Sequence, residues 1–226
     1  MVAVSLITSN RAEESGLLRL IGGGGHSLVV AEAAQLAGFQ LQGFFDDNPA
    51  SPLRALCTHL GPIEDAFHTP CNIATIVAAG DLNLRASIQR QYRGPLATVV
   101  HPSAVISPSA VITEGSYVAA GAIVNAGTMV GTHAIINTRA VVEHDCRLGK
   151  NVHLGPGAIL GGGVRVGQCT LVGIHASVKP NITLGAYCVI GVGAVVVHDV
   201  AHYATAVGVP ARSAQQSHLL TKRTIA

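Results

Sequence analysis

The sequence predicts an α/β domain followed by a solenoid of short parallel β-strands. Two observations lead to this prediction: a glycine-rich turn between a strand and a helix near the start, and a strict period of six residues in the second half of the chain. The composition agrees. Hydrophobic residues make up 49% of the chain but aromatic residues only 4%, so Val, Ile, Leu and Ala must fill the core, which suits thin and even β-layers.

The 226 residues divide into four expected segments. They are a leader (1–16), the α/β domain (17–97), the solenoid (98–200) and a C-terminal tail (201–226). The leader has no basic stretch before its short apolar patch, so we do not expect a signal peptide. No apolar run approaches the about 20 residues that cross a bilayer, so we expect no membrane insertion.

Charge and cysteine content narrow the possible functions. The net charge is +2 and no basic run occurs, which argues against nucleic-acid binding. The cysteines form no CxxC pair, so we expect neither a disulfide framework nor a zinc knuckle, and we expect a reducing, cytoplasmic location. The five are Cys57, Cys71, Cys146, Cys169 and Cys188.

The α/β domain begins with a β-α-β unit. Its predicted parts are a strand (17–21), a glycine loop (22–25), a helix (27–37) with Gly38 after it, and a strand (40–45) that ends at Asp46 and Asp47. The later stretch "NIATIVAAGDLNLRASI" at 72–88 reads as a third strand, a loop with Gly80 and Asp81, and a helix. We therefore expect a small three-stranded, Rossmann-like sheet.

The glycine loop is a candidate anion site. Backbone N–H groups of such a loop and of the helix that follows can bind phosphate, and a carboxylate after the second strand can hold ribose or base groups. The run "GGGGHSL" does not complete a dinucleotide fingerprint. Two alternatives remain open: the loop is a turn without a ligand, and His26 only packs against its neighbours or caps the helix.

The period of six begins at Val100. Every sixth residue from there is a branched aliphatic: Val100, Ile106, Ile112, Val118, Val124, Val130, Ile136, Val142, Leu148, Leu154, Leu160, Val166, Val172, Val178, Leu184, Ile190 and Val196. A mostly small residue comes four places after each, from Ala104 to Ala194. A period of six fits neither a helix nor a simple strand, but it fits a hexapeptide β-solenoid.

Each hexad supplies one short strand and one corner of the solenoid. We expect the aliphatic residue to point inward, the small residue to fit beside it, and the glycine that often follows the aliphatic to accept the backbone twist. Cys146 and Cys188 fall on the small inward position, so we expect them in the core. Cys169 falls outside this pattern and receives no role.

The stretch "VVEHDCRLGKNVHLGPGAILGGGVRVG" carries two unexpected histidines, His144 and His153. If three hexads form one coil, the residue eighteen places further on lies one strand spacing above, about 4.8 Å. Gly162 then lies above His144, where its backbone N–H can serve as an oxyanion donor beside a base. His153 is half a coil away and lies on another face, so the two histidines meet only across a subunit boundary or along a corner cleft.

Asp145 follows His144 directly. A carboxylate partner can orient an imidazole and stabilise its protonated form, which suits a general base. The alternative is that His144 is an exposed histidine without a function.

The order of these motifs resembles a known family. A "GGGGH" β-α-β front, "DD" after the second strand, "HPSAVISPSA" at the start of the hexads, "NTRAVVEHD", and "GVPAR" near the end are similar to the nucleotide-sugar N-acetyltransferases of the PglD and NeuD type. The similarity covers residues from about 17 to 212. It implies a left-handed parallel β-helix of hexapeptide repeats, a homotrimer, and acetyl-CoA as co-substrate without a metal.

The resemblance also implies roles for single residues. His144 becomes the general base for the sugar amine, Asp145 its partner, and the Gly162 N–H the oxyanion donor. The implied substrate contacts are Gly25, His26, Asp46, Asp47 and Asn137, to which the loop residues Gly80 and Asp81 are added. The implied cofactor contacts are His153, Gly162, Ile174 and Val192. Two positions depart from the family pattern: Val192, where Gly is common, and Leu82, where many relatives have Asn.

The predicted activity is transfer of acetyl from acetyl-CoA to a UDP-linked 4-amino-4,6-dideoxy-N-acetyl-hexosamine, for glycan biosynthesis. Several alternatives stay open. They are acetylation of GDP-perosamine or another nucleotide sugar, O-acetylation of the sialic-acid type, a non-catalytic trimeric scaffold or sensor, and a γ-class carbonic anhydrase. The last would bind zinc through three histidines, with His144, His153 and His175 as candidates.

Overall fold

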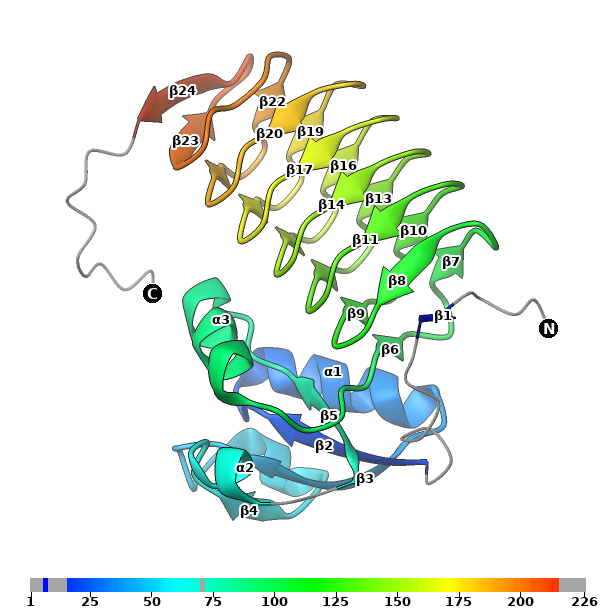
Figure 1. Cartoon of the computed structure of the whole chain (residues 1–226), viewed down its shortest axis with the longest axis vertical. Helices are drawn as coiled ribbons and strands as arrows, with labels where there is room; N and C mark the ends of the chain where they lie inside the picture. The colour runs from blue at the N-terminus through cyan, green and yellow to red at the C-terminus, as the bar shows by residue number, and fades with distance from the viewer. Residues whose placement is uncertain (1–5, 8–15, 70–71, 216–226) are drawn as a thin grey trace.

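The computed structural model describes residues 6–7, 16–69 and 72–215. It contains an α/β domain and a solenoid of parallel strands that stands on it (Figure 1). Cys71 and residues 216–226 lie outside the described residues, as does most of the predicted leader. No described helix is long and apolar enough to cross a membrane.

The α/β domain holds a four-stranded parallel sheet in the order β4-β3-β2-β5. Its elements are β2 (Leu17–Ile21), α1 (Gly25–Leu36), β3 (Gln40–Phe45), the 3₁₀ helix η2 (Pro52–Ala55), β4 (His59–Gly61), α2 (Asp65–His68), β5 (Ala74–Val77) and α3 (Leu82–Gln91). The prediction of three strands was wrong. The extra strand β4 has only three half-buried residues and pairs at the edge of the sheet, so it carries no apolar run that sequence patterns could reveal.

The chain reverses direction across this sheet at β2. It passes from β2 to β3 and β4 on one side and then returns to β5 on the other. Ligands of open parallel sheets bind at such a switch point, beyond the carboxyl ends of the strands. The glycine loop after β2 and the loop 78–81 after β5 meet there, because the Ser27 hydroxyl donates to the Ala78 carbonyl at 3.0 Å.

The solenoid is a left-handed parallel β-helix, as the hexads and the resemblance predict. Its strands are β6 (Val99–Val100), β7 (Val105–Ile106), β8 (Val111–Thr113), β9 (Tyr117–Val118), β10 (Ile123–Val124), β11 (Met129–Val130), β12 (Ile135–Ile136), β13 (Val141–Val142), β14 (Arg147–Leu148), β15 (His153–Leu154), β16 (Ile159–Leu160), β17 (Arg165–Val166), β18 (Leu171–Val172), β19 (Ser177–Val178), β20 (Thr183–Leu184), β21 (Val189–Ile190) and β22 (Val195–Val196). Strands pair with a shift of eighteen residues, for example Val142 with Leu160.

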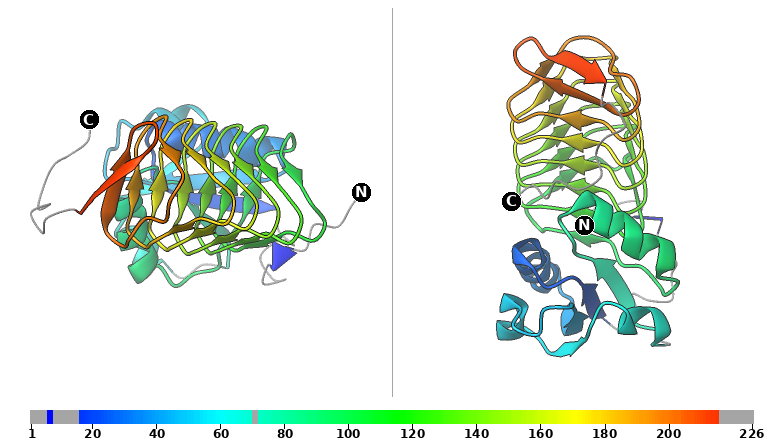
Figure 2. Two further views of the ribbon diagram at one scale, coloured as in Figure 1. Left: turned by 90° about the horizontal axis from the view of Figure 1, so that it is seen from above. Right: turned by 90° about the vertical axis from the view of Figure 1, so that its left-hand side faces the viewer.

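The coils form three flat sheets around one apolar core (Figures 1 and 2). We call them the β13 sheet (β7, β10, β13, β16, β19, β22), the β14 sheet (β1, β8, β11, β14, β17, β20) and the β15 sheet (β6, β9, β12, β15, β18, β21, β23, β24). The hexad aliphatics from Ile112 to Val196 are all buried, and Cys146 and Cys188 are buried beside them. The inward positions were therefore predicted correctly.

The glycines after the inward aliphatics have a different reason from the one predicted. The positive φ values occur two residues later, for example at Asp145 (φ 60°) and Gly163 (φ 70°). Gly149 and Gly167 instead lie under the backbone of the next coil. A Cβ on Gly167 would come within 2.4 Å of the Ala186 nitrogen, so close coil stacking, and not the twist, excludes side chains there.

Both ends of the chain extend the solenoid sheets. Strand β1 (Leu6–Ile7), within the predicted leader, pairs parallel with β8. Strand β23 (Ala204–Val207) continues the β15 sheet after β21, and β24 (Arg212–Gln215) returns antiparallel to it. The range 201–215 thus adds two strands to the end of the β-helix.

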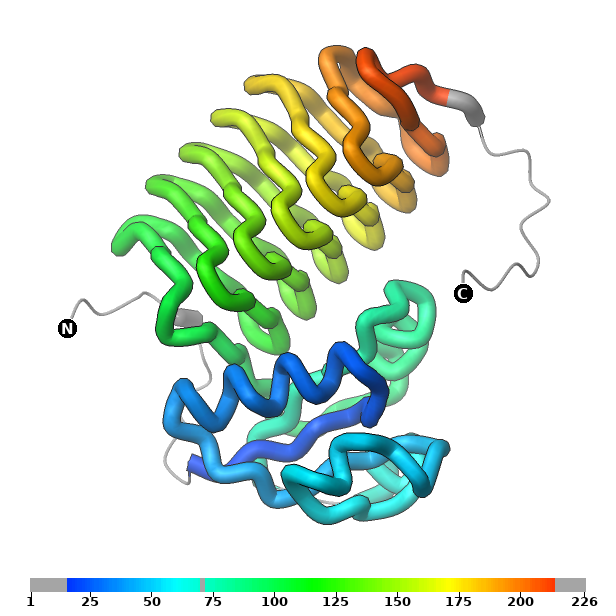
Figure 3. The backbone as a smooth tube through the Cα atoms, turned by 180° about the vertical axis from the view of Figure 1, so that it is seen from behind, coloured from blue at the N-terminus to red at the C-terminus, as the bar shows by residue number. Residues whose placement is uncertain are grey.

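The α/β domain packs under the first coils of the β15 sheet (Figures 2 and 3). One buried cluster unites Val30 and Ala34 of α1 with Tyr117 and Ile135 of the solenoid. The loops at the carboxyl ends of the α/β strands are thereby held beside the β15 sheet.

Candidate active site

His144 and Asp145 form a pair at the corner between β13 and β14. The Nδ1 atom of His144 lies 2.9 Å from Oδ2 of Asp145, and both side chains are largely exposed. Adjacent residues rarely face each other, but Asp145 adopts the left-handed conformation with φ 60°. That turn brings its carboxylate back to the ring of His144 and leaves Nε2 for another partner.

Gly162 lies under the Nε2 edge of His144. A Cβ built on Gly162 would be 2.5 Å from His144 Nε2, and the next coil is tied here by a hydrogen bond of 2.8 Å from Gly163 N–H to the His144 carbonyl. The Gly162 N–H donates to no acceptor within the described residues. The side chain of His144 and the backbone of Gly162 are therefore close neighbours, as the interval of eighteen predicts.

His153 lies on a different face of the same chain. It begins β15, whereas His144 follows β13, as the half-coil separation predicts. Its Nε2 lies 3.3 Å from the Asn137 side-chain nitrogen. Burial is the main cause that lowers the pKa of His153 to about 3, followed by the positive charge of Arg85 and by His26. His153 is therefore neutral at physiological pH.

His26 reaches from the α/β domain into the same region. Its ring lies edge-on to Tyr117 at 5.7 Å between centroids and 6.3 Å from the ring of His153. Burial and the charge of Arg85 lower the pKa of His26 to about 4. Gly80 is close as well, since a Cβ there would be 3.2 Å from the His26 Cβ. His26, Gly80, Asn137 and His153 thus form one cluster at the domain boundary.

The glycines of the 22–25 loop differ in what they face. A Cβ on Gly23 would come within 2.5 Å of the Ser51 Oγ and 2.9 Å of the Phe44 ring, so packing requires a glycine. A Cβ on Gly25, the first residue of α1, would meet nothing within 4 Å. The backbone at Gly25 is thus open to a ligand at the N-terminus of a helix of twelve residues.

The two acids after β3 accept hydrogen bonds from backbone N–H groups. The Asp46 carboxylate accepts from the Gly23 N–H at 2.7 Å and from the Asn48 N–H at 2.9 Å. Asp47 accepts from the Ile63 N–H at 2.9 Å and lines a hollow of about 680 Å³ with Phe67. Asp46 therefore shapes the glycine loop, and Asp47 lies at a space large enough for a nucleobase.

The remaining predicted positions lie in two places, one at the start of α3 and one at a corner of the solenoid. Asp81 caps α3 by accepting from the Leu84 N–H at 2.7 Å, so one of its oxygens serves the helix. Ile174 and Val192 stand one coil apart at the corner between the β15 and β13 sheets, where they are 45% and 73% exposed. This corner is not the one that holds His144.

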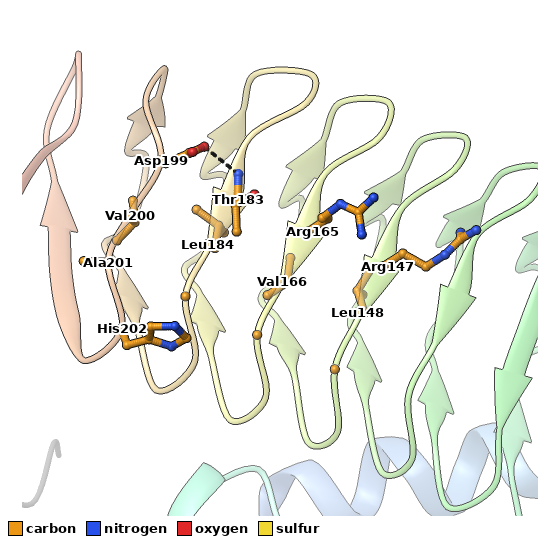
Figure 4. Close-up of a pocket in the computed structure, with 13 residues that line it drawn as sticks. Arg147, Leu148, Arg165, Val166, Thr183, Leu184, Asp199, Val200, Ala201 and His202 are labelled. Carbon is orange, nitrogen blue, oxygen red and sulfur yellow. Dashed lines mark hydrogen bonds between the residues drawn. The ribbon is translucent and has the colours of Figure 1, made fainter.

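The sequence analysis missed a basic groove on the β14 sheet. Arg147 and Arg165 lie directly opposite each other on neighbouring strands. Figure 4 shows both side chains projecting from this face, with Thr183 on the next strand bonded to Asp199. The groove has a volume of about 660 Å³. The arginines occupy outward positions that the hexad pattern leaves free, so their only sequence signal was their spacing of eighteen.

It also missed Arg85 and Asn151, which join the two domains. Arg85 is almost fully buried and donates from Nε to Oδ1 of Asn151 at 2.6 Å. No pattern in the sequence relates two residues that are 66 positions apart.

Among the described residues, no three His, Cys, Asp or Glu side chains lie close enough together within one chain to bind a metal ion. His175, a candidate zinc ligand, is exposed at the corner between the β15 and β13 sheets, next to Ile174. It is therefore remote from the corner of His144 in the same chain.

Comparison with known proteins supplies relatives for both domains. A family model described as the PglD N-terminal domain matches residues 18–92. The structure of PerB from Caulobacter crescentus, in complex with CoA and GDP-perosamine, is 39% identical, covers 87% of this chain and 96% of that chain, and superposes with a TM-score of 0.79. No curated protein sequence matches significantly.

Two further solved structures share the fold. The acetyltransferase domain of PglB from Neisseria gonorrhoeae, in complex with acetyl coenzyme A, is 33% identical with a TM-score of 0.81, and the match covers 88% of this chain and 98% of that chain. WeeI from Acinetobacter baumannii is 23% identical, with coverages of 88% and 99% and a TM-score of 0.74; that likeness concerns the fold alone.

Proposed function

Because this chain belongs to the nucleotide-sugar N-acetyltransferases of the hexapeptide type, we propose that it acetylates the amino group of a 4-amino-4,6-dideoxy sugar linked to a nucleoside diphosphate. It is an acetyl-CoA-dependent acetyltransferase. One observation supports the catalytic assignment above all others: the exposed His144–Asp145 pair lies over Gly162, whose N–H is free among the described residues.

In the proposed mechanism the sugar amine attacks the thioester carbonyl of acetyl-CoA. Nε2 of His144 takes a proton from the nitrogen as the C–N bond forms, and Asp145 stabilises the resulting imidazolium. The carbonyl oxygen becomes an oxyanion that the Gly162 N–H stabilises. The intermediate then collapses, the C–S bond breaks, and the proton on His144 passes to the leaving thiolate. The products are the acetamido sugar and CoA.

The α/β domain is proposed to hold the nucleotide. The open Gly25 backbone at the start of α1 suits the diphosphate, and the hollow at Asp47 suits the base. His26 and Asn137 then face the sugar, because they lie between this domain and the β15 sheet. His153 is proposed to contact the thioester, a role that its neutral ring permits.

The complete site requires two chains. Within one chain His144 and His153 lie on different faces. A site that uses both therefore takes His144 from one subunit of a homotrimer and His153 from the neighbouring subunit. The outward residues of the β13 sheet support such an assembly, since Val105 and Ile159 leave apolar surface exposed at 61% and 44%. Mixing the inactive variants His144→Ala and His153→Ala should restore activity in hybrid trimers. Failure of complementation, with trimers confirmed by light scattering, would place the two histidines in separate functions.

Two nucleotide sugars are candidate substrates. GDP-perosamine is the first, because it is bound in the solved structure that is 39% identical; a UDP-linked 4-amino sugar is the second. Release of the CoA thiol should be measured with both sugars, with the corresponding 4-hydroxy sugars as controls. We expect turnover of an amino sugar only. Turnover of a 4-hydroxy sugar would instead support O-acetylation, and turnover of neither would refute the proposal.

A further inference from the structure

The boundary between the two domains contains one buried positive charge, on Arg85. Arg85 is 1% exposed, and burial lowers its pKa only to about 10, so it stays protonated. No carboxylate within the described residues lies close enough for an ion pair with it. A buried charge without an ionic partner is costly, so the neighbouring hydrogen-bond acceptors must stabilise it.

Three neutral oxygens from two domains accept hydrogen bonds from Arg85, while its buried Nη2 has no partner among the described residues. Its Nε donates to Oδ1 of Asn151 at 2.6 Å, and its Nη1 donates to the carbonyls of Ala79 at 3.0 Å and Gly80 at 3.3 Å. Asn151 in turn donates to the Leu82 carbonyl at 3.1 Å. The guanidinium therefore clamps the loop after β5 to the coil that continues into β15.

Both ends of this clamp lead directly into the boundary cluster. Asn151 precedes His153 by two residues on the same coil, and Gly80 contacts both His26 and, through its backbone carbonyl, His153. A shift of the loop by 1 Å would separate Gly80 from His26 and His153, and misplacement on that scale can cost about a hundredfold in rate.

We propose that Arg85 is a positioning residue for the transfer, which locks the loop after β5 to the coil that carries His153. The inference rests on the proposed function and adds a residue that acts through others. The charge of Arg85 contributes a second effect, since it helps to lower the pKa of His26 and of His153. His153 also faces His26, and no other charged group shifts the pKa of either ring.

The test compares Arg85→Met, Arg85→Lys and the control Gln89→Met. Gln89 donates to the same Asn151 oxygen at 3.0 Å but bonds neither loop carbonyl, so its loss perturbs the boundary without opening the clamp. We expect Arg85→Met to raise the KM for the nucleotide amino-sugar at least tenfold and to lower kcat, while the KM for acetyl-CoA changes by less than twofold. The pKa values of His26 and His153 should also rise, as read from an NMR titration of the histidine resonances of the folded variant.

Arg85→Lys should keep the wild-type pKa values of His26 and His153, because it keeps the charge, but it should restore the KM only in part, because an ammonium cannot fork between the carbonyls. Gln89→Met should leave both KM values within twofold. If Arg85→Met does not fold, the two KM values of Arg85→Lys are compared with those of Gln89→Met instead. Equal changes in both KM values, or the same kinetic loss in Gln89→Met, would overturn the proposal and leave Arg85 a purely structural residue. A wild-type enzyme without turnover would refute the proposed function instead.

Discussion

The imidazole of His144 lies over Gly162, one coil further along the chain, so closely that a methyl group on the glycine would be 2.5 Å from Nε2. Eighteen residues separate the two, which is one full coil of the β-helix. The arrangement places the proposed base and an N–H that is free among the described residues side by side on an exposed corner. The nucleophile and the developing oxyanion can therefore be served by neighbouring atoms.

Loss of the base should abolish most of the activity without unfolding the protein. We expect His144→Ala to lower kcat/KM by about 10²–10⁴-fold, the usual contribution of a positioned general base. Because His144 is exposed, the thermal unfolding temperature of the variant should stay within a few degrees of the wild-type value. Asp145→Asn should cost less, since Asn can keep the left-handed turn. Full activity of His144→Ala in a thiol-release assay would remove His144 from the mechanism.

Gly162→Ala should displace His144. The new methyl overlaps the ring, so the ring must rotate and its alignment with the N–H is lost. We expect kcat/KM to fall by at least tenfold with wild-type affinity for the nucleotide sugar. In the double variant with His144→Ala the clash disappears, so Gly162→Ala should then add little further loss. Independent losses in that cycle would show that the two residues do not act together.

The glycines of the 22–25 loop offer a matched pair. Gly25→Ala meets no atom within 4 Å, so the unfolding temperature should be unchanged while the KM for the nucleotide sugar rises several-fold. Gly23→Ala meets the Ser51 Oγ at 2.5 Å and should destabilise the fold by about 1–3 kcal/mol. Urea unfolding and steady-state kinetics separate the two effects. A Gly25→Ala enzyme with an unchanged KM would exclude ligand contact at that backbone.

Stability should fall in mild acid. The pKa values of His26 and His133 are about 4 and that of His153 is about 3 in the folded chain, mainly because of burial, against 6.5 when unfolded. Below pH 6.5 the unfolded chain binds more protons, so the free energy of unfolding is highest above that pH and falls toward pH 4. Each of these histidines should contribute about 1.4 kcal/mol per pH unit to the slope of the free energy of unfolding against pH.

Urea unfolding at pH 7.5 and 5.5 checks this slope. His133→Asn is the control, since Asn tolerates the φ of 56° at that position and does not titrate. It should reduce the pH dependence by one histidine's share. An unchanged slope in this variant would mean that His133 is not held neutral by the fold.

The corner of His144 was predictable because it depends on a local repeat. His144 and Gly162 are eighteen residues apart, as are the paired inward residues Val142 and Leu160, so counting along the chain gives their relative positions. The alignment of Asp145 with His144 was not predictable in this way, because it depends on a left-handed φ at a residue other than glycine.

In the α/β domain the longer strands and the glycine loop were predictable, but the edge strand and the contacts of the acids were not. The strand bounds 17–21 and 40–45 and the glycine loop follow from their apolar runs and turn residues. The short edge strand β4 lacks such a run, and so it was missed. The acids after β3 were predicted as ligands, but both carboxylate oxygens of Asp46 accept hydrogen bonds from backbone N–H groups. These bonds depend on the folded shape of the loop.

The sequence by itself determined the β-helix, its inward residues and the vertical neighbours on each face, because a repeating coil converts sequence interval directly into distance. Only the tertiary structure decided how the α/β domain meets the solenoid. That boundary joins residues 60 or more positions apart, such as Arg85 with Asn151, through side chains that follow no period. Their contacts depend on how two separately folded surfaces fit, and that fit has no signature along the chain.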